Sequence, residues 1–280
     1  MPDLILVTGA TGNTGTAVVA GLRSRGSHVV RPASRRPDPA DPDALVFDWA
    51  DATTFAAALR GATAMYLVAP AGEADPVSTV GPFLELAADQ GVRRVVLLSS
   101  SAIERGEPGL GEIHDVIAGK FSEATVLRPS WFMQNFVGDH PVAHSIRESR
   151  EIVTATGVGR LGFIDADDIA ATAVEALLAP EPVGEELLLT GPESLSYADA
   201  AAILSEVLGH HIRHVDVSPA ERASQFTAAG LSEEFAGVLA ALDERISAGE
   251  QDFVTTTVRD VTGRPPTSLR DFLHQVHLRR

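Results

Sequence analysis

The stretch V-T-G-A-T-G-N-T-G, residues 7–15, closes an apolar run near the start of the chain. This pattern predicts a buried strand, a tight glycine turn and a helix that opens at Asn13. Gly9 allows the sharp turn, Gly12 lets the backbone approach a pyrophosphate, and Gly15 lets helix and strand pack closely. The N–H groups of the first helical turn have no partners within the helix and lie at the positive end of its dipole, so they bind phosphate. We therefore predict a nucleotide-binding turn; a purely structural turn is the alternative.

The end of the next expected strand, His28–Ser34, indicates which nucleotide is bound. An NAD-binding unit places an acidic residue there to bind the ribose hydroxyls. This chain has Ser34, Arg35 and Arg36 instead, and its first acidic residue after them is Asp38. A hydroxyl beside guanidinium groups suits a 2′-phosphate, because arginine binds phosphate through paired hydrogen bonds and keeps its charge. We expect NADP (as NADPH), with NAD as the other possible cofactor; the alternative is that both arginines are solvated loop residues.

Composition limits the class of protein. The chain has 280 residues, is 45% hydrophobic and carries a formal net charge of −16 at pH 7. So acidic a surface repels nucleic acid and anionic lipid, and neither is expected as a partner. No apolar stretch is long enough to span a bilayer, no secretory signal is recognisable, and there are no cysteines. We expect a cytoplasmic protein that acts on a small molecule, with its oligomeric state open.

Strand and helix signals alternate through the first half of the chain. Such alternation predicts an α/β fold of the Rossmann type, a doubly wound parallel sheet covered by helices on both faces. The remaining strands are expected at residues 44–47, 64–68, 94–98 and 125–127, and the helices at 13–25, 52–59, 77–90 and 113–121. We expect an NADP-binding domain over residues 1–150. A smaller α/β substrate domain is expected over residues 151–280, interleaved with the first.

Further motifs accompany the glycine turn. They are G-V-R-R-V-V-L-L-S-S-S (91–101), L-R-P-S-W-F-M-Q-N-F (127–136) and F-I-D-A-D-D-I-A (163–170). Through these stretches the chain resembles the NmrA-like atypical short-chain dehydrogenases, a branch of the extended short-chain dehydrogenase/reductase superfamily, over nearly its whole length. The resemblance implies a Rossmann-type domain, a small C-terminal substrate domain and a nicotinamide cofactor, usually NADPH.

The resemblance also implies which residues bind the cofactor. The pyrophosphate is implied to lie on Gly9, Thr11, Gly12, Asn13, Thr14 and Gly15. The 2′-phosphate is implied to lie on Ser34 and Arg35, and the adenine beside Asp48 and Trp49. The nicotinamide ribose is implied to lie along Val68, Ala69 and Pro70.

One departure from the family pattern concerns the catalytic acid. Ordinary short-chain dehydrogenases protonate the substrate with the tyrosine of a Tyr-x-x-x-Lys motif. The two tyrosines of this chain are followed at that spacing by other residues, Tyr66 by Pro70 and Tyr197 by Ala201. The resemblance therefore does not extend to a tyrosine acid.

Two residues are candidates to replace that tyrosine. Ser101, the last of three serines, matches the family's substrate-binding serine by its spacing, or else caps a turn. His114 opens the expected helix that stands in place of the Tyr/Lys helix. An imidazole near the nicotinamide supplies a proton at neutral pH; the alternative is a partly exposed histidine of the first helical turn. Lys120, the sole lysine, is expected on the surface.

Aromatic residues are concentrated after the sixth expected strand, in a chain whose aromatic content is only 5%. Trp131, Phe132, Met133 and Phe136 predict the wall of a pocket for a flat apolar substrate, with Asn135 or Gln134 as a polar contact. The alternative is a core that joins the two domains.

No metal site is expected. Three histidines, His210, His211 and His214, lie close together in the sequence, but the segment has the pattern of a strand. At about 3.3 Å per residue, His210 and His214 would stand roughly 13 Å apart, too far for one zinc ion.

The leading functional hypothesis is an NADPH-dependent oxidoreductase. Without a tyrosine acid, the hydride acceptor has to be an electrophile that stabilises or loses the developing charge itself, such as a quinone, an extended aromatic ketone or an iminium ion. The hypothesis from a different class is a redox sensor that binds the dinucleotide without turnover and regulates a partner protein.

Overall fold

The computed structural model describes residues 3–70, 72–73 and 75–278, and the chain forms two compact units that are interleaved along the sequence. Unit 1 comprises Met1–Pro129, Ala166–Leu188 and Asp260–Gly263. Unit 2 comprises Ser130–Asp165, Leu189–Arg259 and Arg264–Arg280. The chain first passes from one unit to the other after Pro129, whereas the sequence predicts a boundary at residue 150.

Unit 1 contains a seven-stranded sheet with the strand order β3-β2-β1-β4-β5-β6-β9. Its strands are β1 (Leu4–Thr8), β2 (Val29–Ser34), β3 (Leu45–Val46), β4 (Ala62–Val68), β5 (Arg94–Leu98), β6 (Glu123–Pro129) and β9 (Glu186–Leu189). The strands from β3 to β6 pair in parallel. The order turns back at β1, with β2 on one side and β4 on the other, which confirms the doubly wound Rossmann-type sheet.

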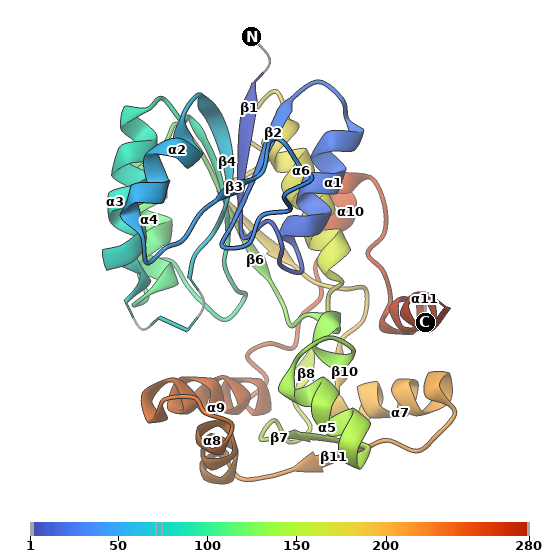
Figure 1. Cartoon of the computed structure of the whole chain (residues 1–280). Helices are drawn as coiled ribbons and strands as arrows, with labels where there is room; N and C mark the ends of the chain where they lie inside the picture. Colours follow the sequence, from blue (N-terminus) through green and yellow to red (C-terminus); the bar gives the residue numbers. More distant parts are fainter. Residues whose placement is uncertain (1–2, 71, 74, 279–280) are drawn as a thin grey trace. The chain divides into compact units, whose positions relative to one another are not determined.

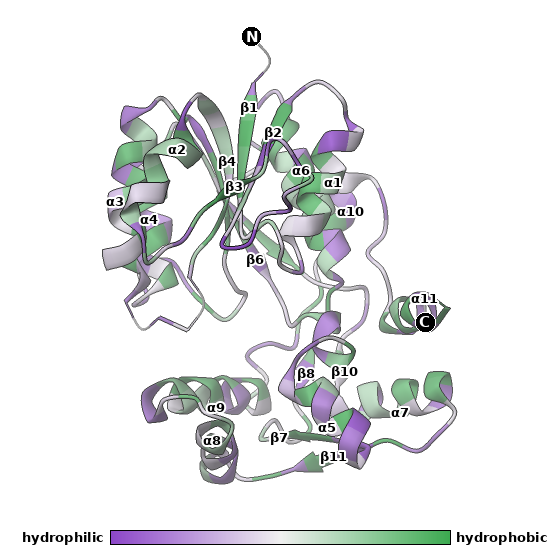
Figure 2. Ribbon diagram, in the orientation of Figure 1, coloured by the Kyte–Doolittle hydropathy of each residue, from purple (hydrophilic) through white to green (hydrophobic). Residues whose placement is uncertain are grey.

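Helices cover both faces of this sheet (Figure 1). On one face lie α1 (Gly15–Ser24) and α6 (Ala166–Leu178). On the other lie α2 (Phe55–Leu59), which continues the short 3-10 turn η1 (Ala52–Thr54), together with α3 (Pro76–Asp89) and α4 (Leu110–Lys120). Because both faces are covered, the central strands carry unbroken apolar runs, which Figure 2 shows as hydrophobic colour along β1 and β4.

The core of unit 1 joins β5 to α4. Leu97 of β5 packs in the same buried cluster as Ile113 and Ile117 of α4. This packing fixes the rotation of α4 and therefore decides which way its other side chains point. Helix α4 begins at Leu110, three residues before the expected start. The Glu112 carboxylate accepts a hydrogen bond from the Gly109 N–H, a donor that has no acceptor within the helix, and this capping contact stabilises the earlier start.

Unit 2 mixes short strands with helices. Its elements are η2 (Met133–Phe136), α5 (Pro141–Ser149), β7 (Glu151–Thr154), β8 (Arg160–Leu161), β10 (Leu195–Ser196), α7 (Tyr197–Leu208), β11 (Arg213–Asp216), α8 (Pro219–Ala228), α9 (Glu233–Ser247) and α11 (Leu269–Leu278). Helix α10 (Thr257–Thr262) spans a boundary between the units. Strands β11 and β7 pair in parallel, and β10 and β8 pair antiparallel. Among the described residues, no helix is both long and apolar enough to cross a bilayer.

Candidate functional site

The glycine turn lies between β1 and α1. Gly9 has a φ of +61°, a conformation that side chains disfavour. A Cβ on Gly15 would stand 2.2 Å from the carbonyl oxygen of Gly9, so no larger residue fits there. The Gly12 N–H donates to the same carbonyl at 2.9 Å, and Gly12 itself is exposed. The turn therefore presents bare backbone at the N-terminus of α1, as a phosphate site requires.

The turn is tied to the neighbouring strand β4 by buried hydroxyls. The Tyr66 hydroxyl donates to the Thr14 Oγ1 at 3.0 Å, and the Val68 N–H donates to the Thr8 Oγ1 at 2.8 Å. Burial raises the pKa of Tyr66 well above its usual range. Tyr66 therefore stays protonated and positions the glycine turn, which is a role that its sequence context did not reveal.

A small cavity lies beside the end of β2, which we call the Ser34 bay. It measures about 120 Å³, and its walls include Ala10, Thr11, Ser34, Asp38 and Asp41. The Ser34 hydroxyl is buried, at 7% exposure of the residue, and has no hydrogen-bond partner among the residues the structure describes. A buried hydroxyl without a partner is costly, and an incoming phosphate oxygen would supply one.

The two arginines that follow Ser34 are exposed. Neither Arg35 nor Arg36 lines the bay, although both follow Ser34 directly in the chain. Both side chains are therefore accessible to a ligand from the solvent.

The other residues implied to bind the cofactor also follow strands of this sheet. The Asp48 carboxylate accepts from the Ala50 N–H at 3.1 Å, and Trp49 packs edge-on against Phe47 with ring centroids 4.8 Å apart. Val68, at the end of β4, lies against the glycine turn, since a Cβ on Gly9 would stand 3.1 Å from the Val68 Cβ. Ala69 and Pro70, directly after it, are half-buried.

These features fit a nicotinamide dinucleotide. The backbone at Gly12 is open to a pyrophosphate, Gly15 permits the helix to start where it does, and the unpartnered Ser34 hydroxyl suits a phosphate on the adenosine ribose. The roles of the individual residues remain those that the sequence predicts.

The structure brings His114 to Ser99 rather than to Ser101. His114 lies in the second turn of α4, is 1% exposed, and its Nε2 is 2.8 Å from the Ser99 Oγ. It is therefore not the partly exposed first-turn residue that the sequence suggested as the alternative. Sequence reasoning missed Ser99 because the motif spacing pointed to the third serine and the rotation of α4 was unknown.

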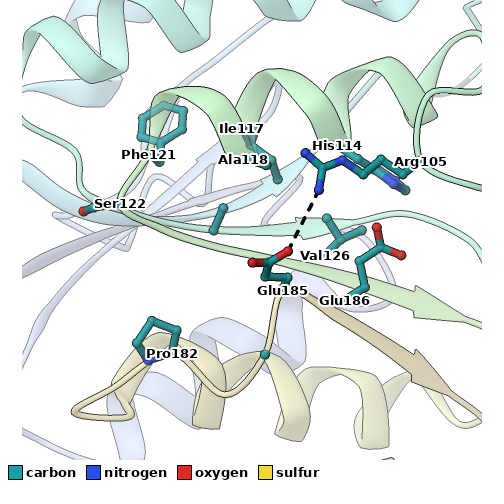
Figure 3. Close-up of a pocket in the computed structure, with 12 residues that line it drawn as sticks. Arg105, His114, Ile117, Ala118, Phe121, Ser122, Val126, Pro182, Glu185 and Glu186 are labelled. Atoms are coloured by element: carbon teal, nitrogen blue, oxygen red, sulfur yellow. Dashed lines mark ion pairs between the residues drawn. The ribbon is translucent and has the colours of Figure 1, made fainter.

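The environment of His114 lowers its pKa. Burial is the largest cause, and the nearby Arg128 and Arg105 act in the same direction against the opposing carboxylate of Glu186. The ring lines a cavity of about 330 Å³, where Arg105 forms an ion pair with Glu185 at 3.9 Å (Figure 3). His114 is therefore a neutral imidazole at physiological pH, which is a weak proton donor.

Ser101 is held in place by the backbone and by Arg128. Its N–H donates to the Pro129 carbonyl at 2.8 Å, and its carbonyl accepts from the Arg128 Nη2 at 3.1 Å. Arg128 also forms ion pairs with Glu104 and Glu186. The motif that contains this arginine does not indicate its role; a charged residue directly after an expected buried strand is the signal that could have done so.

The aromatic segment after β6 belongs to unit 2. Met133 and Phe136 are buried in the core of that unit, where the Phe136 ring lies 5.1 Å from that of Phe163. Trp131, Phe132 and Asn135 are half-buried. Met133 and Phe136 are thus core residues, whereas Trp131, Phe132 and Asn135 are only partly covered, and Trp131 also packs against that core.

Two other titratable residues, Tyr197 and Lys120, make contacts away from the glycine turn. Tyr197 is buried among Phe136, Phe163 and His214, and burial raises its pKa. Lys120 forms an ion pair with Glu85 at 2.6 Å. Among the described parts of the chain, no cluster of His, Asp and Glu residues is arranged to hold a metal ion.

The chain is similar to known NAD(P)H-binding proteins. A model of an NAD(P)H-binding family matches residues 9–180. The chain is 45% identical over 271 residues to an uncharacterized oxidoreductase, YesF, of Bacillus subtilis (strain 168), covering 96% of this chain and 93% of that protein. It is 36% identical to an agroclavine dehydrogenase of Claviceps fusiformis, covering 96% of each chain. Its fold is similar to that of an NADPH-dependent quinone oxidoreductase from Escherichia coli in complex with NADPH, with a TM-score of 0.81 and 21% identity over 99% of this chain and 100% of that one.

Proposed function

The chain belongs to the NAD(P)H-binding NmrA-like branch of the extended short-chain dehydrogenases and is an NAD(P)H-dependent oxidoreductase; from this premise we propose that it uses NADPH to reduce a conjugated electrophile. The dinucleotide, when bound, supplies the hydride. The chain's own residues bind and orient it. No side chain of the protein acts as a dedicated proton donor to the substrate.

The state of the two tyrosines carries this proposal. Tyr66 donates its only hydroxyl proton to Thr14, Tyr197 is packed in the core of unit 2, and burial raises the pKa of both. The sequence offers no lysine at the required spacing from either. A substrate that needs a strong acid in the transition state would find none here, whereas a quinone or an extended aromatic ketone spreads the developing charge itself.

The preference for NADPH is supported by the Ser34 bay. A 2′-phosphate in this bay would give the buried Ser34 hydroxyl its missing partner, and Arg35, the next residue in the chain, is exposed and available to bind the same phosphate. NADH has only a hydroxyl at that carbon and offers no charge to Arg35. We expect NADPH to bind at least about ten-fold more tightly, which corresponds to about 1.4 kcal/mol, a modest demand on one charge-assisted contact.

Trp131, Phe132 and Asn135 are proposed to contact the substrate. Their half-buried side chains are available for a flat ligand, whereas Met133 and Phe136 support them from the core of unit 2. An indole or phenyl face suits an aromatic acceptor, and the Asn135 amide would orient its polar group.

A panel of acceptors tests the proposed reaction. NADPH oxidation is followed by the loss of its absorbance with a simple quinone, an extended aromatic ketone and a saturated cyclic ketone of similar size. We expect turnover with the two conjugated compounds and none with the saturated ketone. Reduction of the saturated ketone at a comparable rate would contradict the proposal, and no turnover with any acceptor would favour the redox-sensor hypothesis.

An imine or iminium ion is the second candidate acceptor. The net charge of −16 attracts cations, and the relatives include an agroclavine dehydrogenase. For a cationic acceptor, kcat/KM should fall as ionic strength rises, because salt screens this attraction. A neutral quinone should show no such dependence.

A further inference from the structure

We propose that Arg23 strengthens the preference for NADPH by neutralising Asp41 in the wall of the Ser34 bay. This inference rests on the proposed cofactor preference and adds the residue that makes the bay tolerate a phosphate. Arg23 lies in the last turn of α1, away from the glycine turn. It is not among the residues given a role in cofactor binding above.

The bay has an unexpected feature for an anion site, which is that its walls carry carboxylates. Asp38 and Asp41 both line it, together with the hydroxyls of Thr11 and Ser34. A dianionic phosphate that entered beside two uncompensated carboxylates would be repelled by both of them. The Ser34 hydroxyl can offer only one hydrogen bond against this repulsion.

Arg23 removes part of this repulsion. Its Nη2 lies 2.9 Å from the Asp41 Oδ1 and 2.7 Å from the Oδ2, so one guanidinium nitrogen contacts both carboxylate oxygens. The Asp41 side chain is only 15% exposed, whereas that of Arg23 is 42% exposed. The carboxylate therefore lies in the wall of the bay with its charge matched, and the arginine reaches it from the solvent side.

The loop that carries Asp41 is held by its own hydrogen bonds, which do not involve Arg23. The Asp41 Oδ1 accepts from the Asp43 N–H at 3.1 Å, and the Asp41 N–H donates to the Asp38 carbonyl at 3.1 Å. The Arg23 guanidinium holds the pKa of Asp41 below its usual range, so the carboxyl stays ionised and paired at neutral pH. Since these loop bonds and the Ala40 N–H bond to the Asp38 carboxylate remain without Arg23, its removal changes the charge beside the bay and leaves the order of the loop in place.

Comparing the affinities for NADPH and NADH distinguishes this charge effect from a general loss of structure. Removing Arg23 leaves the Asp41 charge uncompensated beside the 2′-phosphate of NADPH, but beside a neutral hydroxyl in NADH. Affinity for NADPH should fall while affinity for NADH stays constant. If the substitution only disordered the loop, the affinities for NADPH and NADH would both fall, because the two cofactors share the adenosine.

Titration of four proteins by NADPH and NADH fluorescence tests the inference: the wild type, Arg23→Gln, Asp41→Asn and the double variant. We expect Arg23→Gln to weaken NADPH binding by about three- to ten-fold in low salt and NADH binding by less than about two-fold, with a smaller effect in high salt. Asp41→Asn should bind NADPH at least as tightly as the wild type, and the double variant should regain most of the lost affinity.

Arg25→Gln is the matched control. Arg25 follows α1 at the same end and forms an ion pair with Glu175 of α6, away from the bay, so its loss should leave the ratio of the two affinities unchanged. Thermal unfolding confirms that each variant is folded. An unchanged ratio in Arg23→Gln, in a protein that prefers NADPH, would overturn the role of Arg23 alone. Equal affinity of the wild type for both cofactors would overturn the cofactor preference, and this inference with it.

Discussion

At the scale of single residues, two glycines of the turn have different roles. A Cβ on Gly15 would collide with backbone at 2.2 Å, but a Cβ on Gly12 would approach only the Gly9 carbonyl, at 3.2 Å, and would otherwise face solvent. Gly15 is therefore needed for the fold, and Gly12 is needed for the ligand.

Gly12→Val is expected to leave the protein folded and to abolish dinucleotide binding, because a branched side chain would occupy the space of the pyrophosphate. Calorimetric titration with NADPH measures the loss, and circular dichroism checks the fold. Gly119→Ala in α4 is the control, since a Cβ there meets nothing within 4 Å. If Gly12→Val bound NADPH normally, the phosphates would have to lie elsewhere.

The unpartnered hydroxyl of Ser34 predicts opposite effects on stability and on binding. Ser34→Ala removes a buried polar group that has no partner in the described structure, so the unliganded protein should gain about 0.5–1 kcal/mol in unfolding free energy. NADPH affinity should nevertheless fall by about three- to ten-fold, because a charge-assisted hydrogen bond is lost. Chemical denaturation and fluorescence titration measure the two. Lower stability together with unchanged NADPH affinity would show that the hydroxyl serves the fold and not the phosphate.

At the scale of elements, apolar periodicity predicted the strands and helices of unit 1 well because both faces of the sheet are buried. The periodicity predicted the first and last residues of these elements less well. Helix α4 was expected from Ile113, but its capping by Glu112 moves the start to Leu110. That shift matters for the site, since the pairing of His114 with Ser99 depends on the rotation of α4 against β5. Periodicity identifies the buried face of a helix but not which buried side chains meet.

Helix α5 carries a pH-dependent cap. The His140 Nδ1 accepts from the Val142 N–H at 3.2 Å, and burial together with the nearby Arg222 lowers the pKa of His140 to about 4. The folded protein therefore keeps His140 neutral where the unfolded chain already binds a proton, near pH 6.5. The unfolding free energy should be level above this pH and should fall as the pH drops from about 6.5 to 4, since the unfolded state binds more protons there.

His140→Asn isolates this effect, because asparagine caps a helix without titrating. Between pH 7 and pH 4, the wild type should lose about 1–2 kcal/mol more than the variant, a figure that allows for screening of a partly exposed ring. Urea denaturation at the two pH values measures the difference. Parallel stability curves for the two proteins would show that His140 titrates normally in the folded state.

At the scale of the whole molecule, the sequence predicted the Rossmann-type sheet and the class of cofactor from a few residues at strand ends, where geometry permits little variation. It could not predict contacts that join distant parts of the chain. Tyr66 and Thr14 are 52 residues apart, and Arg128 and Glu186 are 58 apart. Such pairs depend on how strands align in the sheet, which no local pattern of residues specifies.

The central claim is that hydride transfer proceeds without a dedicated side-chain acid, and the reduction rate of a quinone by the His114→Ala variant tests it most directly. A true general acid contributes about a hundred- to ten-thousand-fold to the rate. We expect kcat to fall by less than about a hundred-fold in His114→Ala, and likewise in Ser101→Ala and in Ser99→Ala, which breaks the same hydrogen bond from the other side. A fall of about a thousand-fold or more in His114→Ala, with folding and NADPH affinity intact, would reveal a dedicated acid and contradict the account.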